Sequence, residues 1–312
     1  MDFGADVPFD QVGQKLMEHY GIQVAKSAAR LITYKHARVL QQIENKAIKT
    51  PIDPGNNIPK VVVSATDACM IPIVTPPAVL ETSDSQPLTK QDRRKKKQLG
   101  YQEARLTLAH AQDSATLRFS ATMGNVEEVG KRIKHCVELI GFGDETHVHA
   151  VGDGAVWIAD QVEEQFGCQA TYLVDFYHLC EYLSAAAQKI AGNDKAAWME
   201  RQKTLMKQGE VSQVLAALNP FLEEDDVPES DAPVRACYRY MTNRPDQLDY
   251  KGAIRDKLPI GSGEIESAHR YIIQKRLKLP GSWWLAENAN VMLALRTARA
   301  NNNWQKYWKN AA

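Results

Sequence analysis

The chain has 312 residues, of which 44% are hydrophobic and 24% charged, and its 38 basic residues balance its 38 acidic ones. With a mean hydropathy of −0.41 and no apolar run near the roughly 20 residues that span a bilayer, the composition excludes a membrane protein and predicts a cytoplasmic one. Its five cysteines are scattered and include no C-x-x-C pair, which argues against a zinc ribbon or a disulfide framework.

Formal neutrality conceals segments of strong charge. Residues 92–97 and 270–278 are basic, whereas residues 222–231 are acidic. Because local charge governs binding to phosphate more than the total does, the two basic segments predict contacts with nucleic acid. The residues expected to make them are Arg93, Arg94 and Lys95 in the first segment, and Arg270, Lys275, Arg276 and Lys278 in the second.

The first 45 residues have the spacing of two helices, at 8–20 and 25–43, around a short turn that contains Gly21. This is the layout of a helix-turn-helix, although many helix pairs with this layout bind nothing. We expect residues 1–45 to bind DNA, with Lys26 and Arg30 as contacts, and residues 46–59 to form a linker. The second helix should carry Ala29, Ile32, His36, Val39, Leu40 and Ile43 on one side.

The remainder predicts an α/β fold, a ribonuclease-H-like mixed sheet flanked by helices. A β-branched run at 60–67 ends in Asp67, and residues 70–74 are expected to return as its hairpin partner. Further strands are expected at 101–109, 115–121, 146–152 and 170–175, and further helices at 126–140 and 155–166. Residues 60–178 would thus form the first part of the core, residues 179–262 a helical insertion, and residues 263–312 the helices that complete the core.

Three acids stand at positions suited to a metal site. Asp67 and Asp153 each follow a predicted strand, and the carboxyl ends of parallel strands meet at one rim of a sheet. Glu266 opens a helix that becomes basic, and Glu264 competes with it for the same role. Carboxylates are the ligands of Mg²⁺, so these acids predict two Mg²⁺ ions, or Mn²⁺ in their place, for phosphodiester chemistry. The alternative for each acid is structural: a turn residue, a helix N-cap or a first-turn acid.

Two further motifs lie near these acids. Asp175 ends a predicted buried strand and His178 follows one helical turn later, so both can face the same rim, where His178 could touch a phosphate or orient a carboxylate. The alternative is an N-capping Asp beside a histidine with a structural part. Trp283 and Trp284 could stack on an unpaired base, but we expect them to belong to the core.

The combination of motifs at 152–158, 175–178, 261–268 and 274–284 resembles insertion-sequence transposases of the ISKra type, relatives of the mutator-like DDE transposases. The resemblance runs from about residue 60 to residue 308 and implies that Asp67, Asp153 and Glu266 are the catalytic acids, with Asp175 and His178 as the mutator-type signature. It also implies an enzyme that binds terminal inverted repeats, cleaves double-stranded DNA and joins it to target DNA. Such an enzyme would act as a homodimer or larger assembly at the nucleoid.

One position departs from the resemblance, since Ala68 stands where a glycine commonly follows the first acid. Two alternatives to the transposase also remain open. One is a simple nuclease of the same fold, and the other is a truncated or domesticated copy that binds DNA without catalysis.

Overall fold

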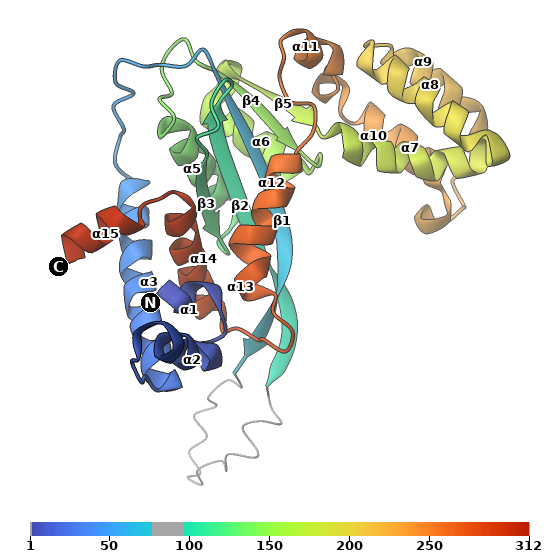
Figure 1. The fold of residues 1–312 in the computed structure, drawn as a ribbon. Helices are drawn as coiled ribbons and strands as arrows, with labels where there is room; N and C mark the ends of the chain where they lie inside the picture. The colour runs from blue at the N-terminus through green and yellow to red at the C-terminus, as the bar shows by residue number, and fades with distance from the viewer. Residues whose placement is uncertain (1, 77–96, 312) are drawn as a thin grey trace, which may run out of the picture.

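A five-stranded mixed sheet forms the centre of the molecule in the computed structural model, which describes residues 2–76 and 97–311 (Figure 1). The strands stand in the order β3-β2-β1-β4-β5; β4 and β5 run parallel to β1, and β2 runs antiparallel to β1 and β3. Their bounds are β1 Val61–Thr75, β2 Gln98–Ala111, β3 Arg118–Thr122, β4 His147–Gly152 and β5 Ala170–Val174. The predicted α/β class with a mixed sheet is confirmed.

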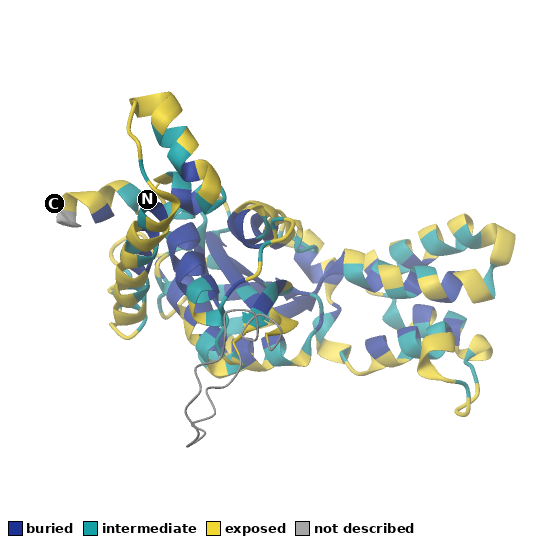
Figure 2. Ribbon diagram, turned by 90° about the horizontal axis from the view of Figure 1, so that it is seen from below, coloured by how far each residue is buried: buried dark blue, intermediate teal, exposed yellow. Residues whose placement is uncertain are grey.

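Helices cover both faces of this sheet, and Figure 2 shows the strands buried between them. On one face lie α5 (Val126–Glu138) and α6 (Val156–Phe166). On the other lie α12 (Gly263–Ala268), the π-helical turn η6 (His269–Gln274), the short α13 (Lys275–Leu277) and α14 (Ala286–Ala300), with α15 (Trp304–Ala311) after them. No helix within the described residues combines the length and the apolar character that a membrane crossing requires.

The hairpin predicted within residues 60–74 is wrong, because β1 is one continuous strand of 15 residues. Residues 68 and 69 are Ala and Cys, which do not favour a turn, and the pairing with β2 continues past them from Val62–Ala111 to Thr75–Gln98. Pro72 is tolerated because β4 pairs with β1 only as far as Ala65, which leaves this end of β1 as an edge. There the main chain of Trp284 bonds to Pro72 and Val74 instead.

Only helices and turns occupy the chain between β5 and α12. They are α7 (Phe176–Ile190), α8 (Lys195–Lys207), α9 (Val211–Leu218), α10 (Pro233–Thr242) and α11 (Tyr250–Arg255), with short 3₁₀ turns between them. This helical insertion projects from the β5 side of the sheet (Figure 1). Its own core, around Leu183, Met206 and Met241, is continuous with the core beneath α5 and α6.

The N-terminal segment forms the expected helices, α1 (Asp2–Asp6), α2 (Phe9–Tyr20) and α3 (Lys26–Ala47). However, α3 packs on α14, α2 and α1, and the residues that it buries are mostly small: Ala29, Thr33 and Ala37, together with Leu40. The predicted apolar face is therefore wrong in part, and Ile32, Val39 and Ile43 are exposed. Small residues allow two helices to approach closely, which explains why they were selected over the larger apolar ones.

A buried ion pair fastens the end of α3 to the core. The Glu44 carboxylate lies 3.2 Å from the Arg132 guanidinium of α5 and accepts a 2.6 Å hydrogen bond from Ser120 of β3. Burial raises the pKa of Glu44, so its ionised form depends on these partners.

Arg132→Leu should therefore lower the free energy of unfolding by about 3–5 kcal/mol, because it leaves the Glu44 carboxylate buried without its cation. Chemical denaturation measures this loss. The matched control is Glu18→Gln, which breaks the exposed pair with Lys15 and should leave the free energy of unfolding almost unchanged, because solvent screens this pair. Equal losses in the two variants would contradict the account.

Candidate functional site

Asp67, Asp153 and Asp175 lie at the same level of the sheet, just beyond the last parallel pairs of β4 with its neighbours. The last β1–β4 pair is Ala65–Val151, and Asp67 and Asp153 each lie two residues beyond it. The last β4–β5 pair is Gly152–Val174, so Asp175 is one residue beyond β5. The shared rim predicted for Asp67 and Asp153 is thus present in the register of the sheet.

Asp67 lies in the middle of β1 rather than at its end, which corrects the sequence-based placement. It reaches the rim because its neighbour β4 stops, not because β1 does. Its Oδ1 accepts a 2.7 Å hydrogen bond from the N–H of Ala68, and its Oδ2 lies 3.4 Å from Nε2 of His269. Burial raises the pKa of Asp67 to about 6, with help from the negative charges of Asp153 and Glu266.

Asp153 occupies a tight turn that the helical insertion holds in place. Its Oδ1 accepts a 2.9 Å hydrogen bond from the N–H of Ala155. The main-chain oxygen of Asp153 accepts a 2.7 Å bond from the Tyr240 hydroxyl, and that of Gly154 accepts bonds from the Arg244 guanidinium. Gly154 has a φ of +84°, and an added Cβ would meet the Tyr240 hydroxyl at 2.5 Å. A glycine is thus required where α10 approaches the turn.

The first turn of α12 separates its two acids. Glu264 points to β2, where its carboxylate lies 3.0 Å from Nε2 of His110. Glu266 is exposed, and its negative charge contributes to the raised pKa of Asp67. Glu264 is thus engaged by His110, and the preference for Glu266 as the metal ligand stays a prediction.

Asp175 is only 2% exposed, and both of its carboxylate oxygens are engaged. Its Oδ1 accepts from the N–H groups of Tyr177 and His178 at 2.6 and 3.2 Å, so it is the N-cap of α7. Its Oδ2 accepts from both the N–H and the hydroxyl of Ser262, in the loop that leads into α12. These bonds make Asp175 a positioning residue, which matches the structural alternative for that acid.

His178 lies on the insertion side of the same rim. Its Nδ1 lies 3.4 Å from the Glu181 carboxylate, and its ring packs edge-on against Tyr182 and Tyr240. A positive charge on His178 would lower the pKa of Asp67, so the two side chains act on one region of space. The structure thus brings His178 near the acids without placing it among them.

The fit to a divalent cation rests on the donor set. Asp67, Asp153 and Glu266 offer carboxylate oxygens alone, the donors that Mg²⁺ and Mn²⁺ take in proteins. Their mutual repulsion, seen in the pKa of Asp67, is what a bound cation would relieve. Within the part of the chain that the structure describes, however, no three such side chains already surround a point where an ion would sit. The donor chemistry fits a divalent cation, and the three carboxylates would have to move closer together to bind one.

The basic residues divide into three groups. Arg93, Arg94 and Lys95 lie outside the described residues. Lys26, Arg30, Arg270, Lys275 and Lys278 are exposed, as phosphate contacts would require. Arg276 is 2% exposed, with its guanidinium over the rings of Phe9 and Trp284 at 4.7 and 4.9 Å, so its predicted contact with DNA is wrong.

The two neighbouring tryptophans differ in burial. Trp284 is buried and donates from its indole to the oxygen of Leu277, as expected of a core residue. Trp283 is 41% exposed and lies against Tyr101 of β2, so its assignment to the core is wrong. Consecutive residues in an extended segment point to opposite sides, which explains the difference.

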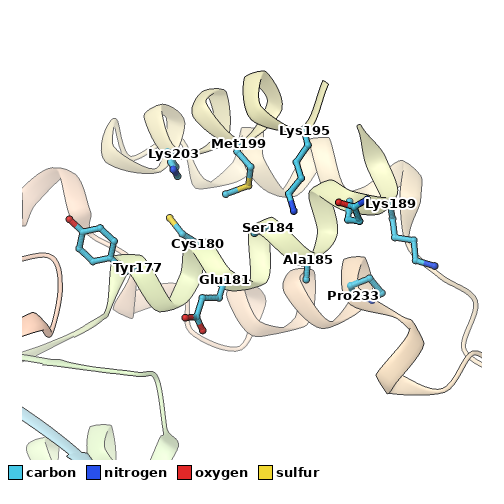
Figure 3. A pocket seen from close by; sticks show the side chains of 11 residues that line it. Tyr177, Cys180, Glu181, Ser184, Ala185, Lys189, Lys195, Met199, Lys203 and Pro233 are labelled. Carbon is cyan, nitrogen blue, oxygen red and sulfur yellow. The ribbon is translucent and has the colours of Figure 1, made fainter. Parts of the chain in front are cut away.

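A groove of about 760 Å³ between α7 and α8 is a feature that the motifs did not indicate (Figure 3). Lys189, Lys195 and Lys203 line it, and the exposed ring of Tyr177 stands at the end nearest the acids. The three lysines are too far apart in sequence to form a basic run, and only the folding back of α8 on α7 gathers them. No local signal could have found them.

Thermal stability should report the cost of ionising the Asp67 carboxylate, whose pKa is raised mainly by burial and further by the charges of Asp153 and Glu266. Because its folded pKa of about 6 exceeds the ordinary 3.8, the folded protein holds this proton more tightly than the unfolded chain does. The stabilising contribution is therefore full below about pH 4 and is lost as the pH rises through about 6. In metal-free buffer, Asp67→Asn should raise the Tm above pH 6, and the two proteins should converge near pH 4.

Asp160→Asn, on the exposed side of α6, is the control and should leave the Tm unchanged at every pH. A Tm for Asp67→Asn below that of the wild type at pH 8 would show that the ionised Asp67 carboxylate does not destabilise the fold, and would contradict this prediction.

The sequence profile of the uncharacterised protein family (UPF0236) matches residues 138–309, more than half of the chain. The matched region runs from the end of α5 to α15 and contains Asp153, Asp175, His178 and Glu266, whereas Asp67 precedes it. Because the matched region covers more than half of the chain, the chain belongs to this family. No curated protein matches the chain.

Proposed function

We propose that this member of UPF0236 is the DNA transposase of an insertion sequence, which cleaves the element ends and joins them to target DNA. One observation carries the proposal. Asp67 and Asp153 lie at the level of the sheet where the β1–β4 pairing ends, and the charges of Asp153 and of Glu266 on α12 both help to raise the pKa of Asp67. Acids gathered in this way are suited to divalent cations and phosphodiester chemistry.

In this proposal Asp67, Asp153 and Glu266 hold two Mg²⁺ ions, or Mn²⁺ in their place. Bound divalent ions supply a nucleophilic oxygen at neutral pH and neutralise the charge of the leaving oxygen. Asp175 keeps α12, and with it Glu266, at the sheet, while Tyr240 and Arg244 keep the Asp153 turn in shape. His178 is placed to contact the phosphate from the insertion side.

The fold supports the same reading. The strand order β3-β2-β1-β4-β5 with β2 antiparallel fits a ribonuclease-H-like sheet. The helices between β5 and α12 fit the insertion that the resemblance to mutator-like transposases implies before the last acid. A simple nuclease would have no use for so large an insertion, which favours end recognition and strand transfer.

The proposed partner is double-stranded DNA, namely the terminal inverted repeats and the target, bound by a homodimer or larger assembly at the nucleoid. Three exposed cations on or just after η6, Arg270, Lys275 and Lys278, follow Glu266 along the same helix. The lysines of the α7–α8 groove extend positive charge away from the acids (Figure 3). Exposed cations on both sides of the acids are suited to a phosphate backbone.

Asp153→Asn and Glu266→Gln should each reduce cleavage of labelled element ends to background, whereas the neighbouring Glu264→Gln should cleave within a few-fold of the wild type. All three should bind the ends equally well, as a mobility-shift assay checks. Full cleavage by both Asp153→Asn and Glu266→Gln would contradict the catalytic site. Joining of pre-cut ends to target DNA then separates a transposase from a nuclease.

The triple variant Lys189→Ala, Lys195→Ala and Lys203→Ala should weaken DNA binding. The slope of log affinity against log salt should fall by roughly 2 to 3 as three phosphate contacts are lost. The matched control removes Lys49, Lys131 and Lys134, which line a second recess of about 740 Å³ beside α3 and α5. Equal effects of the two triple variants would show that total charge, rather than the groove, determines binding.

A further inference from the structure

We propose that His269 is a positioning residue that fixes the Asp67 carboxylate against α12, so that Asp67 and Glu266 can share a divalent cation. This inference rests on the metal site of the proposed function. His269 is the first residue after α12 and the first of the π-helical turn η6. In a helix, residues three apart lie on the same side, so His269 and Glu266 project from one side of this helix, and His269 contacts Asp67 of β1.

The ring of His269 is enclosed, with only 2% of the residue exposed. Its Nε2 lies 3.4 Å from Oδ2 of Asp67, just beyond the usual range of about 2.7–3.2 Å for an N–H···O bond. Neither ring nitrogen completes a hydrogen bond of good geometry among the described residues, and the main chain of Asp67 also lies within reach of the ring. An enclosed donor without an acceptor is costly, so a ring that stands against a carboxylate is poised to close this bond.

Closing the bond would fix both oxygens of Asp67. Oδ1 already accepts from the N–H of Ala68, and Oδ2 would accept from His269. One rotamer of Asp67 is then selected, and each oxygen keeps a lone pair for a cation shared with Asp153 and Glu266. The π-helical turn supplies the room, since an extra residue per turn displaces the ring from its α-helical position, and such turns recur at functional sites.

The chain contains its own control for this contact. His110 of β2 is also buried, and its Nε2 lies 3.0 Å from the carboxylate of Glu264 on the same helix. The two histidines make the same kind of contact between the sheet and α12. Only the contact of His269 involves an acid assigned to the metal site.

The test measures Mn²⁺ binding to the full chain at pH 8 by calorimetry, without DNA and without turnover. His269→Ala should weaken Mn²⁺ binding by roughly 10- to 100-fold, the usual effect of losing a group that orients a metal ligand. His269→Gln, whose amide can still donate to Asp67, should recover most of the affinity. His110→Ala should bind Mn²⁺ like the wild type.

Wild-type affinity in His269→Ala, when Asp67→Asn binds weakly, would overturn this inference and leave the metal site standing. Unchanged binding in both Asp67→Asn and Asp153→Asn would overturn the metal site itself. Circular dichroism checks that each variant folds. If neither His269→Ala nor His269→Gln folded, His269 would be a packing residue and the inference would fail.

Discussion

A single buried carboxylate closes the helical insertion at its base, and the candidate site depends on it. Asp175 ends the parallel strands, caps α7 at the start of the insertion and accepts two hydrogen bonds from Ser262 at its end. Beside it, the N–H of Phe176 bonds to the oxygen of Ile260. The chain can therefore leave the sheet for more than 80 residues and return to the point of departure. This closure adds to the core packing of Ile265 and Ala268 in holding α12, and with it Glu266, at the sheet.

The helical insertion also contacts the candidate site directly. Tyr240 of α10 and Arg244 just after it bond to the turn that carries Asp153, and the ring of Tyr240 stacks on that of Tyr182 in α7 at 4.1 Å. The same helices carry His178 and the lysine groove. Movement of the insertion, on binding DNA for example, would therefore be transmitted to an acid of the candidate site. This coupling would link recognition of an element end to cleavage.

Much of the site follows from local sequence, for a physical reason. Asp153 follows a strand as the sequence predicted, whereas Asp67 reaches the same rim because the pairing with β4 ends at Ala65 while β1 continues. The continuous β1 was missed because strand length depends on pairing with β2, which a local pattern does not contain. Arg276 was misassigned because its burial depends on Phe9 and Trp284, which meet only in the folded chain. His269 carried no signal for the same reason.

The central claim is that Asp67, Asp153 and Glu266 share divalent cations. An anomalous difference map from crystals of the protein soaked in Mn²⁺ tests it most directly. The account predicts one or two peaks bounded by these three carboxylates, with Glu264 still turned to His110. A map whose peaks lie elsewhere, or in which Asp67 and Glu266 face away from the bound ion, would contradict it.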